Sequence, residues 1–259
     1  MLRVLPLLLA LLWQATSQTS GPVERALGLF NAGRYQECLA EIAPYVSQNP
    51  ASATGHKILG MDQYMLGNVT AALAEVQRAT ELNPNDPGAF YYLGRLYFST
   101  DDPLKALAAF KTAVALDASD VRTHNQLGQT YEALNRLPEA EVEYKKAIEL
   151  EKTQPKKSEW PYYNLGLLCL KAGRRDEAAQ YLRTALDRRP QFPEAQVKLA
   201  QVLEATRLYS EAIQLLEQAI QEEPHNSEAH YRLALLLSKE GNQAEAEQQF
   251  ALFRKYRSP

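Results

Sequence analysis

The sequence lacks an apolar run long enough to cross a bilayer. Its apolar segment from Val4 to Trp13 has ten residues, whereas a membrane-spanning helix needs about 20. Cysteine is scarce, with two residues in 259, and the 12 glycines and 14 prolines are close to average usage. These shortages exclude a polytopic membrane protein, a collagen-like chain and a low-complexity or loop-dominated scaffold.

A strong excess of charge of one sign is also missing. The 28 Lys and Arg against 31 Asp and Glu give a formal net charge of -3. No overall positive field would attract a phosphate backbone, so we expect no nucleic-acid partner. What the chain does have, 46% hydrophobic and 23% charged residues, is typical of a folded protein.

Residues 1–17 have the layout of a secretory signal peptide. Arg3 supplies a positive start, the apolar segment follows, and Ala15 and Ser17 are small enough for the pockets of a signal peptidase. Cleavage after Ser17 predicts an exported chain, periplasmic or secreted, that begins at Gln18. The alternative is an uncleaved anchor, and membrane association would then arise only through that anchor or through a partner.

A period of 34 residues organises the rest of the chain. Leu-Gly or Leu-Ala pairs recur in steps of 34, 34, 38, 34 and 34 residues, at 59–60, 93–94, 127–128, 165–166, 199–200 and 233–234. The period defines seven repeats, numbered 1 to 7 in chain order, which span residues 19–52, 53–86, 87–120, 121–154, 159–192, 193–226 and 227–259. A four-residue insertion, 155–158, separates repeats 4 and 5.

Each repeat predicts two antiparallel helices. In repeat 3, helical spacing places Phe90 and Tyr97 on one face, and Ala106 and Phe110 on the face of a second helix. The Asp-Pro pair at 102–103 lies between them. It is typical of a helix start, because aspartate caps free amides and proline is tolerated in the first turn.

This arrangement resembles the signature of the tetratricopeptide repeat family over nearly all of residues 19–259, and the matching residues of repeat 3 are Phe90, Leu93, Gly94, Tyr97, Ala106, Phe110 and Ala113. The resemblance implies an all-α fold, a right-handed superhelical solenoid of about seven antiparallel helix pairs. Repeat 1 departs from the pattern. It carries Pro44 inside its second helix, which predicts a kinked terminal repeat.

No pattern in the sequence points to catalysis, because it has no glycine-rich phosphate loop, nucleophile elbow or zinc-binding pair. His56, His124 and His230 each occupy the fourth position of a repeat, too far apart to share one metal ion. Cys38 and Cys169 are four repeats apart, so we expect free, buried thiols rather than a disulfide. We therefore expect no enzymatic activity, no cofactor and no metal.

In the family, the first helix of each repeat lines a concave groove, and the resemblance implies that the corresponding positions here bind a peptide or protein segment. The candidate residues are Lys57, Met61, Tyr64, Tyr91, Arg95, Phe98, Arg122, Asn125, Gln129, Trp160 and Tyr163. Rigid aromatic side chains with arginine are favoured at peptide interfaces, and the cationic residues suggest a ligand that carries acidic residues. Glu194, Glu204 and Glu228 make the later repeats more acidic. Alternatively, the aromatic residues pack between repeats.

The sequence thus favours a non-catalytic protein–protein interaction scaffold outside the cytoplasm. The alternative is a regulatory or substrate-presenting accessory subunit of an envelope or secreted enzyme. Two interpretations also remain for the loop that contains the insertion, Glu151 to Ser158, next to Trp160. It either contributes to partner binding or is a tolerated polar loop.

Overall fold

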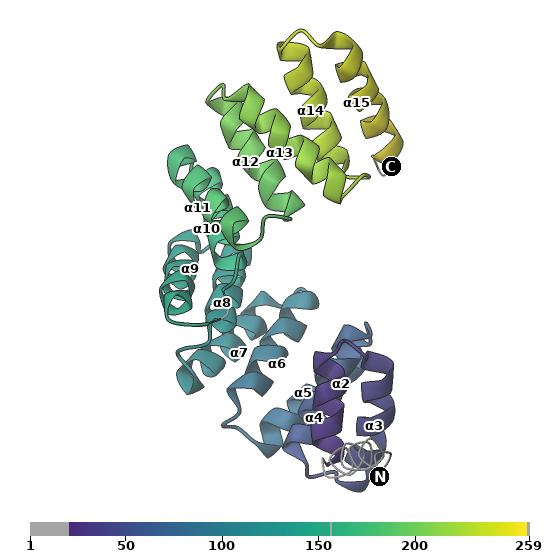
Figure 1. The fold of residues 1–259 in the computed structure, drawn as a ribbon. Helices are drawn as coiled ribbons and strands as arrows, with labels where there is room; N and C mark the ends of the chain where they lie inside the picture. Colours follow the sequence, from purple (N-terminus) through teal and green to yellow (C-terminus); the bar gives the residue numbers. More distant parts are fainter. Residues whose placement is uncertain (1–20, 156, 258–259) are drawn as a thin grey trace, which may run out of the picture. The chain divides into compact units, whose positions relative to one another are not determined.

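The computed structural model describes residues 21–155 and 157–257. Within these ranges the chain forms fourteen α-helices and no strands (Figure 1), which confirms the predicted all-α repeat fold. None of these helices is long and apolar enough to span a bilayer. The predicted signal peptide, residues 1–17, lies outside the described residues. The chain divides after Ser119 into an N-terminal and a C-terminal unit.

Three helix pairs form the N-terminal unit, one for each of repeats 1 to 3. They are α2 (Pro22–Asn31) with α3 (Tyr35–Gln48), α4 (Ala53–Met65) with α5 (Val69–Leu82), and α6 (Pro87–Ser99) with α7 (Pro103–Leu116). Asp102 caps α7 by accepting a hydrogen bond of 3.1 Å from the amide of Lys105, which confirms the predicted helix start. Helix α3 continues past Pro44 to Gln48.

Four helix pairs form the C-terminal unit, one for each of repeats 4 to 7. They are α8 (Val121–Ala133) with α9 (Leu137–Lys152), α10 (Trp160–Lys171) with α11 (Arg175–Arg188), α12 (Pro193–Ala205) with α13 (Tyr209–Glu222), and α14 (Ser227–Lys239) with α15 (Gln243–Tyr256). The first helix of a pair is hereafter the one that precedes the turn.

The turn inside every repeat places one residue in the left-handed region of the backbone. Glycine holds that position in four repeats, at 33, 67, 173 and 241, with φ between 72° and 86°. Asp101, Asn135 and Arg207 hold it in the others, with φ of 59°, 55° and 62°. Arginine in this region costs about 1–2 kcal/mol, so repeat 6 retains local strain that the glycine-containing repeats avoid.

The eighth position of a repeat must be small because the second helix packs directly against it. A Cβ atom at Gly94 would lie 2.7 Å from the ring of Phe110, and one at Gly60 would lie 2.5 Å from Val76. In both repeats the contacting side chain is sixteen residues later and fully buried. The spacing of small and large residues in the sequence therefore encodes the close approach of the two helices.

Gly94→Ala should destabilise the N-terminal unit by about 1–3 kcal/mol, because the added methyl group overlaps the Phe110 ring. Gly28→Ala on α2 is the matched control: a Cβ atom added to this exposed helical glycine would have no neighbouring atom within 4 Å, so alanine should stabilise by about 0.5–1 kcal/mol. Urea unfolding followed by circular dichroism measures both changes. Equal stability of Gly94→Ala and wild type would contradict the close approach.

Histidine or glutamine at the fourth position connects a repeat to the turn before it. The Nε2 atom of His56 lies 3.0 Å from the carbonyl oxygen of Pro50, and that of His230 lies 3.1 Å from the carbonyl oxygen of Pro224. Gln196 donates to the carbonyl of Pro190 at 3.0 Å. His56 and His230, like His124, also bond through Nδ1 to a side chain of their own second helix. All three histidines are buried, as expected for packing residues. Among the described residues no group of three or more His, Cys, Asp or Glu is placed to hold a metal ion.

Two off-pattern residues meet between repeats 1 and 2. Asp62 holds the tenth position, where the later repeats have Leu96, Thr130, Leu168, Val202 and Leu236. It is fully buried, and its carboxylate oxygens have no hydrogen-bond partner among the described residues. Burial raises the pKa of Asp62 to about 6. Cys38 holds the twentieth position of its repeat, where the other repeats have alanine. Burial and the Asp62 carboxylate raise the pKa of the Cys38 thiol to about 12.

Ionisation of Asp62 should weaken the N-terminal unit. Because the folded carboxyl group holds its proton up to about pH 6 and the unfolded one only up to about pH 4, the folded state loses about 2–3 kcal/mol as the pH rises between those values. Asp62→Leu should therefore stabilise more at about pH 7.5 than at about pH 4.5, as measured by urea unfolding. The exposed Asp187→Asn on α11 serves as the control. An equal gain from Asp62→Leu at both pH values would contradict a buried carboxylate.

Candidate functional site

Two predicted site residues of the N-terminal unit, Tyr64 and Tyr91, lie next to Arg95 on α6. The guanidinium carbon of Arg95 lies 4.9 Å from the ring centre of Tyr64 on α4, 5.9 Å from that of Tyr91 and 5.8 Å from that of Tyr92. These cation–π contacts hold the arginine between two successive first helices. Tyr92 was not among the predicted site residues, although its place beside Tyr91 in the sequence could have indicated it.

The other predicted residues of this unit are largely committed to packing or ion pairing. Met61 and Tyr91 are buried, and Tyr91 packs on Phe110 with ring centres 6.1 Å apart. Phe98 is half-buried. Lys57 forms a 2.6 Å ion pair with Asp86, which also caps α6. Tyr64 and Arg95 therefore remain the half-buried pair best placed to contact a partner, whereas Met61 and Tyr91 can offer little surface.

In the C-terminal unit, Asn125 on α8 is buried and accepts a 2.9 Å hydrogen bond from Asn164 on α10. This amide bond fixes repeat 5 against repeat 4, so Asn125 has a structural contact instead of a free surface. Arg122 is exposed and pairs with Asp120 at 3.0 Å. Gln129 is half-buried on the same helix.

Trp160 and Tyr163 belong to an aromatic cluster with Phe192. The Phe192 ring centre lies 5.1 Å from that of Trp160 and 4.9 Å from that of Tyr163, and Arg189 lies 5.0 Å from the Phe192 ring centre. Phe192 is fully buried, whereas Trp160 is 41% exposed. Burial, with the charges of Glu194 and Glu228 nearby, raises the pKa of Tyr163 to about 12, so its hydroxyl stays protonated and can donate.

The sequence did contain a signal for Phe192. It occupies the capping position before α12, where the equivalent residues before α4, α6, α8 and α14 are Ser52, Asp86, Asp120 and Asn226, each of which caps its helix with a side-chain oxygen. Phe192 cannot cap a helix, and α12 has no side-chain cap. An aromatic residue at a capping position indicates a packing role strong enough to replace the cap.

Glu151 organises the insertion next to this cluster. Its side chain is fully buried, accepts 2.9 Å from the Tyr162 hydroxyl and 3.3 Å from the Ser158 amide, and pairs with Arg188 at 3.2 Å. Lys157 donates to the Glu151 backbone carbonyl at 2.9 Å. The Glu151 carboxylate thus connects the insertion, through Ser158, to repeat 5, through Tyr162 and Arg188. Tyr162 is in the first turn of α10, where Trp160 also lies.

The acidic residues predicted for the later repeats are mostly neutralised. Glu204 pairs with Lys239 at 2.6 Å and with Arg232 at 3.8 Å. Glu228 pairs with Lys198 at 2.9 Å and with Arg232 at 3.0 Å. Burial alone would raise the pKa of Glu228, but hydrogen bonds from Lys198 and Arg232 lower it. These first helices therefore do not present the acidic surface that the list of glutamates suggested.

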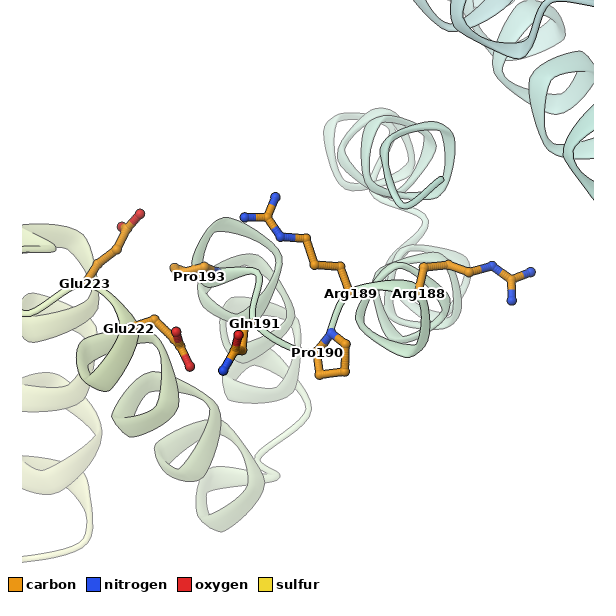
Figure 2. Close-up of a pocket in the computed structure, with 7 residues that line it drawn as sticks. All are labelled: Arg188, Arg189, Pro190, Gln191, Pro193, Glu222 and Glu223. Atoms are coloured by element: carbon orange, nitrogen blue, oxygen red, sulfur yellow. The ribbon is translucent and has the colours of Figure 1, made fainter. Parts of the chain in front are cut away.

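Hollows of about 680, 450 and 430 Å³ lie on the C-terminal unit. The first is formed around the turn between α11 and α12 and the end of α13 (Figure 2). Its arginines are committed elsewhere, because Arg188 extends away from Glu222 and Glu223 toward Glu151, and Arg189 pairs with Glu159 at 3.5 Å. The hollow of about 430 Å³ is lined by Leu170, Arg175, Gln201, Val202, Glu204, Ala205, Arg232 and Lys239.

The helix pairs define an α-helical repeat protein. Models of the tetratricopeptide repeat match residues 23–87, 59–121 and 163–222, then 119–191, and finally 207–255. The chain belongs to the tetratricopeptide repeat family. Its fold supports a protein–protein interaction scaffold with protein or peptide partners.

Solved structures share this fold at low sequence identity. Pseudomonas aeruginosa pilF is 22% identical, with a TM-score of 0.73 over 81% of this chain and 94% of that one. PilW, a widely conserved type IV pilus biogenesis factor, is 20% identical with a TM-score of 0.70 over 78% and 92%. YrrB, a tetratricopeptide repeat protein with an unusual peptide-binding site, is 20% identical with a TM-score of 0.57 over 70% and 92%. No curated protein matches the sequence.

Glu151→Gln should destabilise the C-terminal unit by about 1–3 kcal/mol, because a buried charge-assisted hydrogen-bond network loses its acceptor charge. In a chain from Gln18 to Pro259, which contains every described residue, Trp160 is the one tryptophan, so its emission reports the same change locally. Glu149→Gln is the control: Glu149 lies on the same helix, is exposed and pairs with Lys152, and it should change stability by less than about 0.5 kcal/mol. Equal stability of the two variants would show that the Glu151 network is not structural.

Proposed function

We propose that this chain is a non-catalytic scaffold that binds a peptide or protein segment on the first helices of its repeats, outside the cytoplasm. The observation that carries the proposal is the aromatic cluster at the start of α10. Trp160 is 41% exposed and rests edge-on against the buried Phe192. A large ring that is already fixed in place loses little rotamer entropy when a partner covers it.

The distribution of exposed aromatic residues supports the same surface. Among the described residues, the exposed large hydrophobic side chains include two aromatics, Trp160 on α10 and Tyr231 on α14, and both are on first helices. Tyr231 is braced by Phe253 and Phe250 of α15, with ring centres 5.0 and 6.2 Å away. In the N-terminal unit, the half-buried Tyr64 with Arg95 provides a comparable contact. Each unit thus carries its own binding surface.

Two features support the remaining parts of the proposal. The segment from Arg3 to Ser17 has the pattern of a signal peptide, which supports export. The three histidines of the fourth positions already make structural hydrogen bonds, which supports a role without catalysis. An accessory subunit of an exported enzyme would use the same surface.

Trp160→Ala should weaken partner recognition by the C-terminal unit while leaving the fold intact. Cross-linked affinity capture from the native compartment, followed by measurement of binding to the captured partner, should show weakening on the order of thirtyfold. Val142→Ala is the control, because Val142 is 63% exposed on the second helix α9 and should leave binding unchanged. In the N-terminal unit, Tyr64→Ala is the corresponding test variant. Leu104→Ala on the second helix α7 is its control, because Leu104 is exposed.

Each outcome of this experiment has a definite meaning. Equal capture by wild type, Trp160→Ala and Tyr64→Ala would contradict recognition on the first helices. A captured enzyme whose rate changes on binding would make the chain an accessory subunit.

Sequencing of the exported chain should find Gln18 at its amino terminus, and a start at Met1 would contradict cleavage.

A further inference from the structure

The hollow of about 430 Å³ on the C-terminal unit lies on the proposed binding surface. Leu170 of α10, Val202 and Ala205 of α12 supply its apolar part, and Arg232 and Lys239 of α14 supply charge. First helices of three successive repeats therefore contribute to one hollow of about 430 Å³. Arg175, the first residue of α11, also lines it. A ligand segment that crosses these helices would pass over this hollow.

The hollow has more positive than negative charge. Three cationic side chains, those of Arg175, Arg232 and Lys239, line it together with one carboxylate, that of Glu204. Including the next ion pairs adds Lys198 and Glu228, one charge of each sign. The positive excess of two charges therefore persists when the ion-pair partners of Glu204 and Arg232 are counted.

The neighbouring hollows lack this excess. The adjoining one is lined by Arg174, Arg175, Asp176 and Glu177, two charges of each sign. The hollow of Figure 2 has two arginines and two glutamates, and its arginines pair with Glu151 and Glu159. Positive charge is thus concentrated in the hollow between α10, α12 and α14, although it is smaller than the one in Figure 2.

We propose that this cationic hollow, lined by Arg175, Arg232 and Lys239, receives the carboxylate of an aspartate or glutamate side chain in the bound peptide segment. The inference rests on the proposed function and adds the chemistry of its ligand. Guanidinium groups bind carboxylates through paired, charge-assisted hydrogen bonds. The side chain of Arg232 is only 21% exposed, so water screens its charge less than it would at an open surface. The apolar part of the hollow can cover the methylene groups of the ligand side chain.

A randomised peptide library provides the probe. Wild-type chain should select peptides enriched in aspartate and glutamate. For a selected peptide, Lys239→Glu and, separately, Arg175→Gln should weaken binding on the order of tenfold, as measured by fluorescence anisotropy. The matched control is Arg183→Glu: Arg183 is 47% exposed and pairs with Glu211, as Lys239 is 46% exposed and pairs with Glu204. Circular dichroism verifies that each variant is folded.

The outcomes separate this inference from the proposed function. The cationic hollow is supported if Arg183→Glu retains binding and Lys239→Glu loses it. A peptide with glutamine in place of glutamate should then bind wild type and Lys239→Glu equally. Selected peptides without acidic enrichment, or equal effects of Lys239→Glu and Arg183→Glu, overturn the hollow and leave peptide binding in place. No selected peptide at all would overturn both.

Discussion

The close approach of the two helices inside each repeat is the constraint on which the rest of the structure depends. Glycine at the eighth position leaves space for a side chain sixteen residues later, as with Gly94 under Phe110 and Gly166 under Leu182. Repeats 6 and 7 replace it with Ala200 and Ala234, both almost fully buried. Because a repeat cannot cover its own apolar faces alone, tight pairs must then stack on their neighbours.

Polar contacts determine how consecutive repeats join once the pairs have formed. The fourth-position side chain reaches the carbonyl at the end of the preceding repeat, as His56 does at Pro50 and Gln196 does at Pro190. Each such bond contributes about 0.5–1.5 kcal/mol, less than the packing, but it fixes direction. The histidines are therefore used in structure, which agrees with their shared fourth position in the repeat.

The 34-residue period predicted the helix pairs because small, large and capping residues recur at fixed positions. It predicted the exposure of the candidate site residues less well, because a position in a repeat does not tell which neighbour covers it. Tyr91 and Asn125 share the fifth position with Tyr163, yet the first two are buried and the last is half-exposed. The net charge of the surface was harder still to predict from the sequence. Glu204 meets Lys239 across 35 residues, and only the fold shows that this pair cancels.

Subtracting these structural contacts leaves a small set of side chains for the proposed recognition. The glutamates Glu194, Glu204 and Glu228 made the later repeats look acidic, but the same first helices also carry Lys198, Arg232 and Lys239. With Arg175 of α11, the hollow between α10, α12 and α14 is cationic. The same subtraction retains Trp160, whose neighbours Tyr163 and Phe192 fix its ring without covering it. In the proposed function, the fixed aromatic surface supplies affinity at little entropic cost. The cationic hollow supplies selectivity there, since a segment without a carboxylate leaves its charges unsatisfied.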